Sequence, residues 1–405
     1  MTSGAVSVVL SGIGGMGDVY LDALLDGRDG GRARIVGAAD PEPERSRNFN
    51  RLRALSVPIF PDLESFFDRE PADLAVISSP HHFHAAQTVL SLSRGCHVLC
   101  EKPAAATIQD VRTMMEAERR SGRWAAVGYQ WSFNPAFQEL KKDILAGRLG
   151  RLRRARCLYL WPRTFAYYAR NGWAGRLRDD SGAWILDGPA HNAMAHDLHN
   201  IFYLLGDRTA TSAVPLRVTA ELYRAYPIEN CDTAAARVEV QGGAEVVFLV
   251  SHVPEEERGP LCEFEFERAK VRIDGRTGPI LARWAAERIE KIYGIPDADL
   301  LRKLWLSIDG VKTGERPLCG LEASASQVLC VNGIQDSAEE VGLFPSDLVA
   351  ETGEGENRRL AVAGLDECLA SCYEAWSLPS EMGFSWARPG RPVDLAGYGD
   401  FPSRV

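Results

Sequence analysis

Three glycines lie directly after an apolar, strand-like run in a pattern suited to holding a dinucleotide. The run Val6–Ser11 is followed by Gly12, Gly14 and Gly17, which match Gly-x-Gly-x-x-Gly, and a helical stretch then continues to Leu25. In this context the first glycine permits a tight turn, the second lets the backbone approach a pyrophosphate, and the third lets helix and strand pack closely. We therefore expect the cofactor to be lined by Gly12, Ile13, Gly14, Gly15, Met16 and Gly17.

A carboxylate, Asp40, ends the next strand-like run, where it can accept hydrogen bonds from both hydroxyls of a ribose. The same carboxylate would repel the 2′-phosphate of NADP, and no cation follows it directly, because the next residues are Pro-Glu-Pro-Glu. Arg45 and Arg47 could fold back toward this position. The sequence therefore predicts NAD as the cofactor, with NADP as the less favoured alternative.

Asp187 and His191 have types and a spacing suited to proton transfer. Residues four apart on a helix share a face, so both side chains can point into one cleft. A carboxylate beside an imidazole holds its tautomer and stabilises the imidazolium that forms when the ring accepts a proton. A structural ion pair at the start of a helix is the alternative interpretation of the same spacing.

Aromatic residues are interspersed with arginines between residues 161 and 176. Aromatic faces can stack on the C–H face of a pyranose, and arginine or asparagine can hydrogen-bond hydroxyls or a carboxylate. We expect Arg163, Tyr168 and Trp173 in this segment to contact a substrate. The alternative is a packed connecting loop whose aromatic side chains belong to the core.

Apolar runs alternate with amphipathic stretches in the first third of the chain. This alternation predicts a parallel, doubly wound Rossmann sheet with helices between its strands. We place this dinucleotide-binding domain at residues 1–130. Its expected strands are Val6–Ser11, Arg34–Ala39, Leu74–Ser78, Cys96–Cys100 and Trp124–Gly128.

A helix that starts at Asn134-Pro135 and stops at Gly147 precedes a series of longer strand-like runs. Their spacing, with Gly242-Gly243 as a hairpin turn, predicts a large, mostly antiparallel open sheet. We therefore expect the fold class α/β with an added α+β domain, residues 131–405, for substrate binding and oligomerisation. Its expected strands are Arg151–Leu160, Arg217–Tyr226, Ala234–Gln241, Ala244–Val253 and Cys262–Ile273.

Two further motifs follow expected strands: Ser-Ser-Pro-His-His-Phe-His at residues 78–84 and Glu-Lys-Pro at residues 101–103. With the glycine motif and Asp187-x-x-x-His191, they resemble the glucose-fructose oxidoreductase / inositol dehydrogenase (Gfo/Idh/MocA) family of NAD(P)-dependent oxidoreductases. The resemblance implies that Lys102 reaches the reacting hydroxyl and that Tyr129 approaches the nicotinamide and the substrate. It also implies cofactor contacts from Ser78, Ser79, Pro80, His84, Glu101, Lys102 and Tyr129.

The match to the family weakens after His191. Family members often have an aspartate three residues later, where this chain has Met194, so the substrate of the inositol or glucose enzymes does not transfer. We assign His196 to substrate contact or to helix packing. We expect no metal at His191, His196 and His199, because a five-residue step turns about 140° around a helix.

Together these residues predict NAD-linked oxidation or reduction of a secondary hydroxyl of a sugar, cyclitol or glycoside. Lys102 would stabilise the developing alkoxide, His191 would exchange the proton, and Asp187 would orient His191. One alternative is an NAD-dependent glycosidase that uses transient oxidation and elimination without net redox change. The other is a non-enzymatic NAD sensor, against which the presence of Lys102 and His191 argues.

Composition limits the remaining possibilities. The formal net charge of −9 disfavours nucleic-acid binding, and five arginines between residues 148 and 156 are expected on one solvated strand face. No run approaches the ~18 apolar residues of a membrane helix, so we expect a cytoplasmic protein. Open sheets of this family pack face to face, which implies a homodimer or homotetramer. The nine cysteines never occur as Cys-x-x-Cys, so we expect free, mostly buried thiols.

Overall fold

The computed structural model describes residues 4–28 and 30–403. The chain divides into two compact units, the first made of residues 1–133 and 299–325 and the second of residues 134–298 and 326–405. The first division falls three residues after the boundary expected at residue 130. The return of residues 299–325 to the first unit was not predicted. Within the described part of the chain, no helix has the length and apolar character needed to cross a bilayer.

The first unit is a Rossmann fold with six parallel strands in the order β3-β2-β1-β4-β5-β6. The order reverses between β1 and β4, where ligands of doubly wound sheets bind. The five predicted strands are present within a few residues of their expected limits, and only the short β3 was not predicted. The strands are β1 (Val6–Ser11), β2 (Ala33–Ala39), β3 (Ile59–Phe60), β4 (Leu74–Ile77), β5 (His97–Cys100) and β6 (Ala125–Val127).

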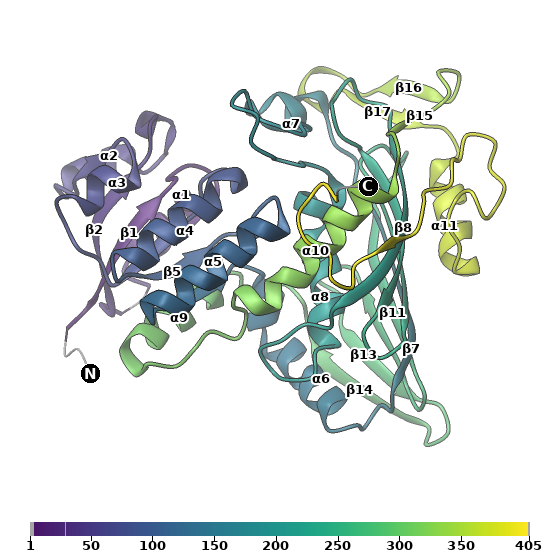
Figure 1. Cartoon of the computed structure of the whole chain (residues 1–405), viewed down its shortest axis with the longest axis horizontal. Coiled ribbons are helices and arrows are strands. Elements are labelled where there is room, and N and C mark those ends of the chain that lie inside the picture. Colours follow the sequence, from purple (N-terminus) through teal and green to yellow (C-terminus); the bar gives the residue numbers. More distant parts are fainter. Residues whose placement is uncertain (1–3, 29, 404–405) are drawn as a thin grey trace. The chain divides into compact units, whose positions relative to one another are not determined.

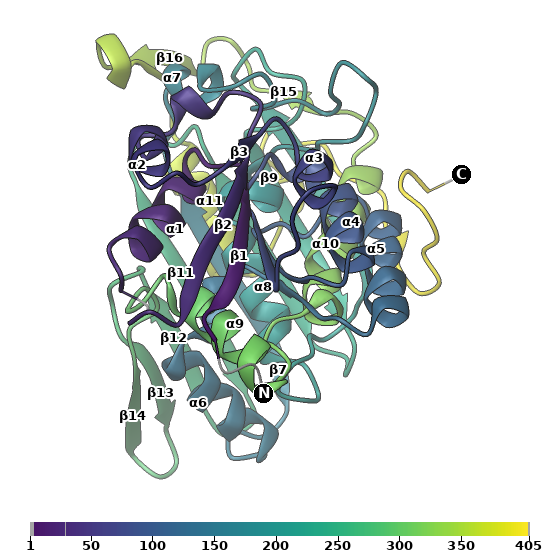
Figure 2. The ribbon, with the colours of Figure 1, turned by 90° about the vertical axis from the view of Figure 1, so that its left-hand side faces the viewer.

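Helices cover both faces of this sheet, with α1 on one side and α4 and α5 on the other (Figure 2). The sequence sets the limits of α5, since Thr107 accepts a hydrogen bond from the Asp110 amide and Gly122 ends the helix with a φ of 67°. α9, from the returning segment, contacts β1 and β5. The helices are α1 (Met16–Leu25), α2 (Phe49–Ala54), α3 (Leu63–Phe67), α4 (His84–Ser93), α5 (Ile108–Ser121) and α9 (Arg302–Thr313).

The second unit is built on a ten-stranded sheet in the order β14-β13-β12-β11-β7-β10-β9-β8-β15, with β18 also paired to β8. Neighbouring strands are antiparallel except in the pairs β7·β10 and β8·β15, so the predicted, mostly antiparallel sheet is confirmed. The strands are β7 (Leu152–Leu160), β8 (Pro215–Arg224), β9 (Thr233–Val240), β10 (Glu245–Ser251), β11 (Arg258–Phe266), β12 (Lys270–Asp274), β13 (Ile280–Trp284), β14 (Ile289–Gly294), β15 (Gly342–Leu343) and β18 (Val393–Asp394). A separate hairpin pairs β16 (Val349–Thr352) with β17 (Arg359–Val362).

The sequence predicted one hairpin turn of the large sheet correctly and missed another. The predicted turn at Gly242-Gly243 joins β9 and β10, and both glycines have positive φ angles, 97° and 82°. The single strand predicted over Cys262–Ile273 is wrong, because the chain turns after Phe266 and β12 pairs back on β11. The alternation of polar and apolar residues is interrupted only at the adjacent polar pair Glu267-Arg268, and the segment contains no glycine, proline, asparagine or aspartate that would signal a turn.

Helices lie on both faces of the large sheet, with α6 and α8 on one side and α11 on the other (Figure 1). The α11 side is an apolar core in which Leu158, Leu160 and Leu249 of the sheet pack with Leu365 and Leu369. The helices are α6 (Pro135–Leu145), α7 (Phe165–Ala169), α8 (Ala195–Leu204) and α11 (Leu365–Ala375), together with α10 (Leu321–Ser337), which begins in the first unit and continues in the second.

Charged residues pair across the strands on the α11 side of the sheet. Glu263 accepts hydrogen bonds from Arg156 at 3.0 Å and from Arg272 at 2.6 Å, and the neighbouring pair Arg154–Glu265 is 2.7 Å apart. Arg156 is only 6% exposed. The expectation that the whole arginine run lies on a solvated face is therefore wrong for Arg156, which lies beneath α11.

Cys157 and Cys262 lie on the opposite side of the same two strands. They face each other directly in the β7·β11 ladder, with their Cα atoms 4.1 Å apart, and they form a disulfide. The other seven cysteines are free, so the prediction of free thiols throughout is wrong for this pair. The two cysteines are 105 residues apart, and only the strand register brings them together.

Candidate functional site

The glycine loop has the geometry expected of a dinucleotide-binding turn. Gly12 has a φ of 77°, and a Cβ there would lie 2.5 Å from the Ser79 amide nitrogen, while a Cβ on Gly17 would lie 2.1 Å from the Gly12 carbonyl oxygen. A Cβ on Gly14 would meet no atom within 4 Å. The protein's own packing therefore requires the first and third glycines, whereas Gly14 keeps the loop surface bare. α1 begins at Met16, and no side chain caps its N-terminus.

Asp40 is tied to this loop from the end of β2. Its carboxylate accepts hydrogen bonds from the Ile13 amide and the Glu42 amide, both at 2.9 Å. The two arginines that could have favoured NADP are engaged elsewhere, since Arg45 pairs with Glu42 and Arg47 pairs with Asp22. The geometry around Asp40 therefore suits a ribose diol.

The segment after β4 also contacts the glycine loop. The Ser78 hydroxyl donates to the Gly12 carbonyl at 2.6 Å, Ser79 donates to Gln87 at 2.7 Å, and Pro80 leads into the short turn His81–Phe83. His84 is buried, and its ring nitrogens lie 2.8 Å from the Pro103 carbonyl and 2.9 Å from the Ser79 carbonyl. His84 thus connects the segments after β4 and β5, and its contact with the cofactor remains a prediction.

A buried charge cluster holds the end of β5. The Glu101 carboxylate accepts hydrogen bonds from the Tyr20 hydroxyl, from the Lys303 ammonium and, at 3.2 Å, from the Lys102 amide. Lys303 also donates to the Gly128 carbonyl at 3.1 Å. Burial alone would raise the pKa of Glu101, but the charge and hydrogen bond of Lys303 outweigh it, so the pKa is lowered. Sequence reasoning missed Lys303 and Tyr20.

Lys102 and Tyr129 follow neighbouring strands at the same edge of the sheet. Lys102 comes directly after β5, is half-buried and precedes Pro103 through a cis peptide bond. Tyr129 comes after β6 and is fully buried, and burial raises its pKa well above the usual value. Contact of either side chain with a substrate remains a prediction, and the burial of Tyr129 favours a packing role.

Asp187 and His191 do not lie on one regular helix. The turn that carries His191 is a π-helix, Pro189–Ala193, and Asp187 precedes it outside any helix or strand, so the argument from α-helical spacing is wrong. The Asp187 carboxylate is instead fixed by the Gly175 amide at 2.7 Å and the Asn192 side-chain amide at 2.8 Å. Both Asp187 and His191 are buried, and their catalytic roles remain predictions.

The histidines of α8 occupy buried positions. Burial, followed by the charge of Lys141, holds the pKa of His199 well below the usual value. The His199 ring stacks on Tyr203 with centroids 5.7 Å apart, which makes its role structural. His196 is 8% exposed on the same helix, and its contact with a substrate is not established by this position.

The segment from Trp161 to Trp173 forms a stack of alternating rings and guanidinium groups. The Arg163 guanidinium carbon lies 3.5 Å from the Trp161 ring centroid and 4.5 Å from that of Tyr167. The Arg170 guanidinium carbon lies 3.7 Å from the Tyr167 centroid and 5.1 Å from that of Trp173. We call these five residues the arginine–aromatic stack.

Residues outside the segment support this stack. The Tyr168 hydroxyl lies 3.0 Å from Nδ1 of His252, a residue that sequence reasoning did not single out. Burial, followed by the charges of Arg163 and Arg170, holds the pKa of His252 well below the usual value. Burial also raises the pKa of Tyr167, and the Asp187 carboxylate adds to this rise. The stack and Asp187 therefore belong to one neighbourhood of the second unit.

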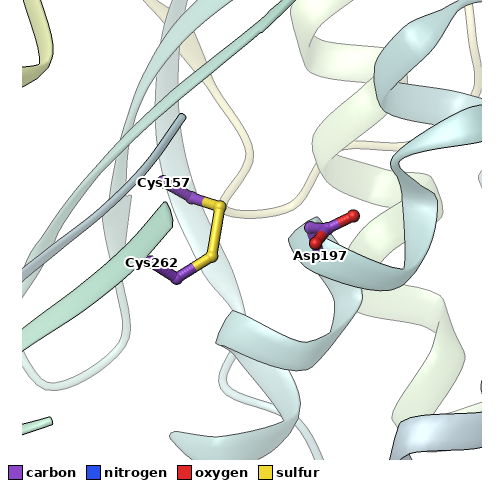
Figure 3. Close-up of side chains that lie close together, drawn as sticks. All are labelled: Cys157, Asp197 and Cys262. Atoms are coloured by element: carbon purple, nitrogen blue, oxygen red, sulfur yellow. A yellow bond between two sulfur atoms is a disulfide. The ribbon is translucent and has the colours of Figure 1, made fainter. Parts of the chain in front are cut away.

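Asp197 of α8 faces the Cys157–Cys262 pair (Figure 3). The two sulfurs and a carboxylate oxygen of Asp197 lie within 4.8 Å of one another. The sulfurs are bonded to each other, and a disulfide sulfur is not a thiolate ligand. Burial lowers the pKa of Arg276, but the charges of Asp197 and other groups raise it overall, so Arg276 already balances this carboxylate. We assign no metal to the cluster.

A Rossmann unit with this glycine loop and an acidic residue after β2 defines a dinucleotide-binding protein. The chain belongs to the Gfo/Idh/MocA family. Residues 6–129 match the "Oxidoreductase family, NAD-binding Rossmann fold", and residues 137–280 match the "GFO/IDH/MocA C-terminal domain". The predicted family, fold class and NAD-binding domain are thereby confirmed.

Relatives of this chain include named dehydrogenases. It is 32% identical to inositol 2-dehydrogenase 1 of Saccharopolyspora erythraea over 146 residues, which cover 36% of this chain and 43% of that protein. It is also 32% identical to 1-carboxy-3-chloro-3,4-dihydroxycyclohexa-1,5-diene dehydrogenase of Comamonas testosteroni over 142 residues, 35% of this chain and 36% of that one. The matched segments thus span less than half of these relatives.

The fold is also similar to that of a solved structure, the WlbA dehydrogenase from Bordetella pertussis in complex with NADH and UDP-GlcNAcA. The TM-score is 0.67 at 22% sequence identity, and the match covers 82% of this chain and 97% of that one. This likeness supports the architecture of both units.

Proposed function

We propose that this chain catalyses NAD-linked hydride transfer to or from a carbon that bears a secondary hydroxyl, in a sugar, a cyclitol or a glycoside. The observation that carries the proposal is the Glu101-Lys102-Pro103 segment. Glu101 and His84 hold it at the carboxyl end of β5, two strands from the glycine loop. The dehydrogenase names of the relatives agree with this class of reaction.

Each residue of the proposed site has a task set by its chemistry. The bound NAD accepts or supplies the hydride. The Lys102 ammonium stabilises negative charge that develops on the substrate oxygen, and His191 takes or returns the hydroxyl proton at a ring nitrogen. Asp187, held by Gly175 and Asn192, would orient His191.

Replacement of Lys102 by alanine tests the first of these tasks. We expect Lys102→Ala to keep the fold and the affinity for NAD but to lose most turnover, since the ammonium is needed only as oxyanion charge develops. NADH absorbance with a panel of sugars, cyclitols and aryl glycosides measures turnover, and Lys142→Ala on the exposed face of α6 is a matched control. Turnover near that of the unmodified enzyme would contradict the assignment.

Replacement of His191 by asparagine tests the proton transfer. We expect His191→Asn to lower the rate by ~10²–10⁴-fold, as is typical for loss of general acid–base catalysis. Alcohol oxidation by the unmodified enzyme should fall at low pH, where a protonated imidazole accepts no proton, and the variant should lack this acid limb. An unchanged rate with a lower melting temperature would make the residue structural.

The same panel separates the proposal from the glycosidase alternative. A dehydrogenase accumulates NADH in proportion to oxidised sugar. A glycosidase of the alternative kind would instead release aglycone without accumulating NADH, and it would exchange a substrate C–H for solvent deuterium. That result would contradict net hydride transfer and would support transient oxidation followed by elimination.

A further inference from the structure

Both arginines of the arginine–aromatic stack lie over the Tyr167 ring, with their guanidinium carbons 4.5 and 3.7 Å from its centroid. Among the described residues, neither Arg163 nor Arg170 has a carboxylate oxygen within the 4.0 Å of an ion pair. Nearby Arg176 pairs with Asp180 at 2.8 Å and Glu229 at 3.4 Å. Arg156 pairs with Glu263 at 3.0 Å. The two guanidinium groups beside Tyr167 therefore lack the carboxylate counterions that Arg156 and Arg176 have.

The stacking fixes the orientation of these two guanidinium groups and leaves N–H donors available in each. A guanidinium that lies over an aromatic ring keeps its N–H groups in its own plane, free to form a bidentate contact with an oxyanion. Arg170 donates one N–H to the Tyr167 carbonyl, and Nε of Arg163 is buried without a hydrogen-bond partner among the described residues. Unused donors therefore remain in both groups.

Solvent does not fully screen this charge. Arg163 is half-buried, and burial lowers its pKa from the usual value, with Arg170 adding like-charge repulsion. His252, which contacts the Tyr168 hydroxyl, supplies no counterion, because an imidazole ring carries either no charge or a positive one. Placing a second cation beside the partly desolvated Arg163 is unfavourable unless an anion joins them. The Asp187 carboxylate accepts hydrogen bonds from the Gly175 amide and the Asn192 side-chain amide.

From these observations we propose that Arg163 and Arg170 bind an anionic substituent, a carboxylate or a phosphate, of the sugar or cyclitol substrate. The aromatic rings of Trp161, Tyr167 and Trp173 would flank this group and the adjoining ring. The inference rests on the proposed function, which gives a sugar, a cyclitol or a glycoside as the substrate. It narrows this class to sugars or cyclitols that carry an acidic group. Its binding step needs no chemical change in either arginine.

Binding to the enzyme saturated with NADH tests the inference without turnover, because an alcohol cannot pass a hydride to reduced cofactor. The panel pairs glucose with glucuronate and glucose 6-phosphate, and inositol with an inositol monophosphate. Calorimetric titration should show at least one anionic member binding about 10- to 100-fold more tightly than its neutral partner, as a charge-assisted contact provides. The carboxylate and phosphate arms distinguish the two anions. Added salt should weaken only the anionic members.

Two variants and one control assign the effect to the stack. Arg163→Met keeps an apolar stem between the rings, and Arg170→Gln alters an exposed position. Each should remove most of the preference for the anion. Arg176→Gln removes an arginine that already has carboxylate partners, and it should leave the preference intact.

The outcomes separate this inference from the proposed function. If no anionic member binds more tightly than its neutral partner, or if the preference survives in both variants, the inference is wrong even when neutral sugars are oxidised. If anions bind through the two arginines but no panel member forms NADH from NAD, the inference stands and the hydride-transfer proposal fails. A lower melting temperature with unchanged preference in Arg163→Met would make the stack purely structural.

Discussion

Lys303 is the cation that allows Glu101 to remain charged inside the first unit. The lysine is 1% exposed, and its ammonium contacts both the Glu101 carboxylate and the Gly128 carbonyl. Glu101 in turn accepts the Lys102 amide. A residue 202 positions away therefore supports the backbone that carries the proposed catalytic lysine.

We expect Lys303→Met to destabilise the protein by about 3–5 kcal/mol, because the substitution leaves a buried carboxylate without its cation. Urea denaturation measures the change. Adding Glu101→Gln should recover part of the loss, since the uncompensated charge is then removed, and Lys312→Met on the same helix is the matched control. A loss no larger than that of the control would show that Glu101 is balanced by other groups.

Residues with local partners could be predicted, and residues with distant ones could not. Gly12, Gly17 and Asp40 lie within one βαβ unit, where spacing alone implies their neighbours. Lys303 has no motif of its own, because its task depends on a helix that returns from the other end of the sequence. The two arginines of the stack were visible as residues, but their lack of carboxylate partners required the structure.

Among the helices and strands, too, some could be predicted from the local sequence pattern and others could not. The parallel strands were predictable from buried apolar runs, whereas the turn between β11 and β12 contains no typical turn residue and interrupts the alternation only at Glu267-Arg268. Asp187 and His191 have the spacing of a helical pair, yet the chain forms a π-helix that begins after Asp187. Local periodicity does not reveal the replacement of an α-helix by a π-helix, because that replacement follows from packing against the rest of the unit.

The β7·β11 pair supplies an element-scale prediction. We expect replacement of Cys157 and Cys262 by alanine to lower the free energy of unfolding by about 2–4 kcal/mol, the usual contribution of a disulfide that closes a long loop. Urea denaturation with and without reductant measures this, and reductant should affect the unmodified protein but not the variant. Titration of nine thiols in the unfolded, unreduced protein would show that the disulfide does not form.

The connection between β8 and β9 contains a carboxyl group whose titration affects stability. Asp232 accepts hydrogen bonds from the Ala225 and Tyr226 amides at 2.7 and 2.9 Å, and burial raises its pKa from 3.8 to about 7. The folded state therefore holds this proton more tightly than the unfolded state. The resulting stabilisation is complete below about pH 4 and is lost as the pH rises through about 7.

We therefore expect the unmodified protein to lose stability relative to Asp232→Asn as the pH rises between these limits, since asparagine does not ionise. Melting temperatures of both proteins at several pH values measure the difference. Asp394→Asn, at the exposed position of β18, controls for a general effect of removing a carboxylate. A difference that stays constant with pH would mean that Asp232 titrates alike in the folded and unfolded chains.

At the level of the whole molecule, the first unit is assembled from two stretches of chain. Residues 299–325 contribute α9, the Arg32–Asp309 ion pair at 2.7 Å and a backbone hydrogen bond of 2.9 Å from the Val127 amide to the Cys319 carbonyl. The predicted domain at residues 1–130 therefore lacks part of its own core. The oligomeric state, a dimer or tetramer, remains a prediction, and α11 already covers part of one sheet face.

A fragment that ends at Phe133 should consequently fail to unfold cooperatively, because it exposes the surface under α9 and leaves Glu101 without Lys303. We expect the same fragment joined through a flexible linker to residues 299–325 to recover a cooperative transition and NAD binding. Calorimetry and cofactor titration measure both properties. Cooperative unfolding of the short fragment alone would show that the returning segment is dispensable.

The discontinuous first unit also has a consequence in time. Roughly 190 residues separate Phe133 from Ala325, and a ribosome adds about 5–20 residues per second. For about 10–40 s of synthesis the nascent sheet therefore exists without the helix that completes it. During that interval the side of β1 and β5 that α9 later covers is open to chaperones that shelter nascent chains.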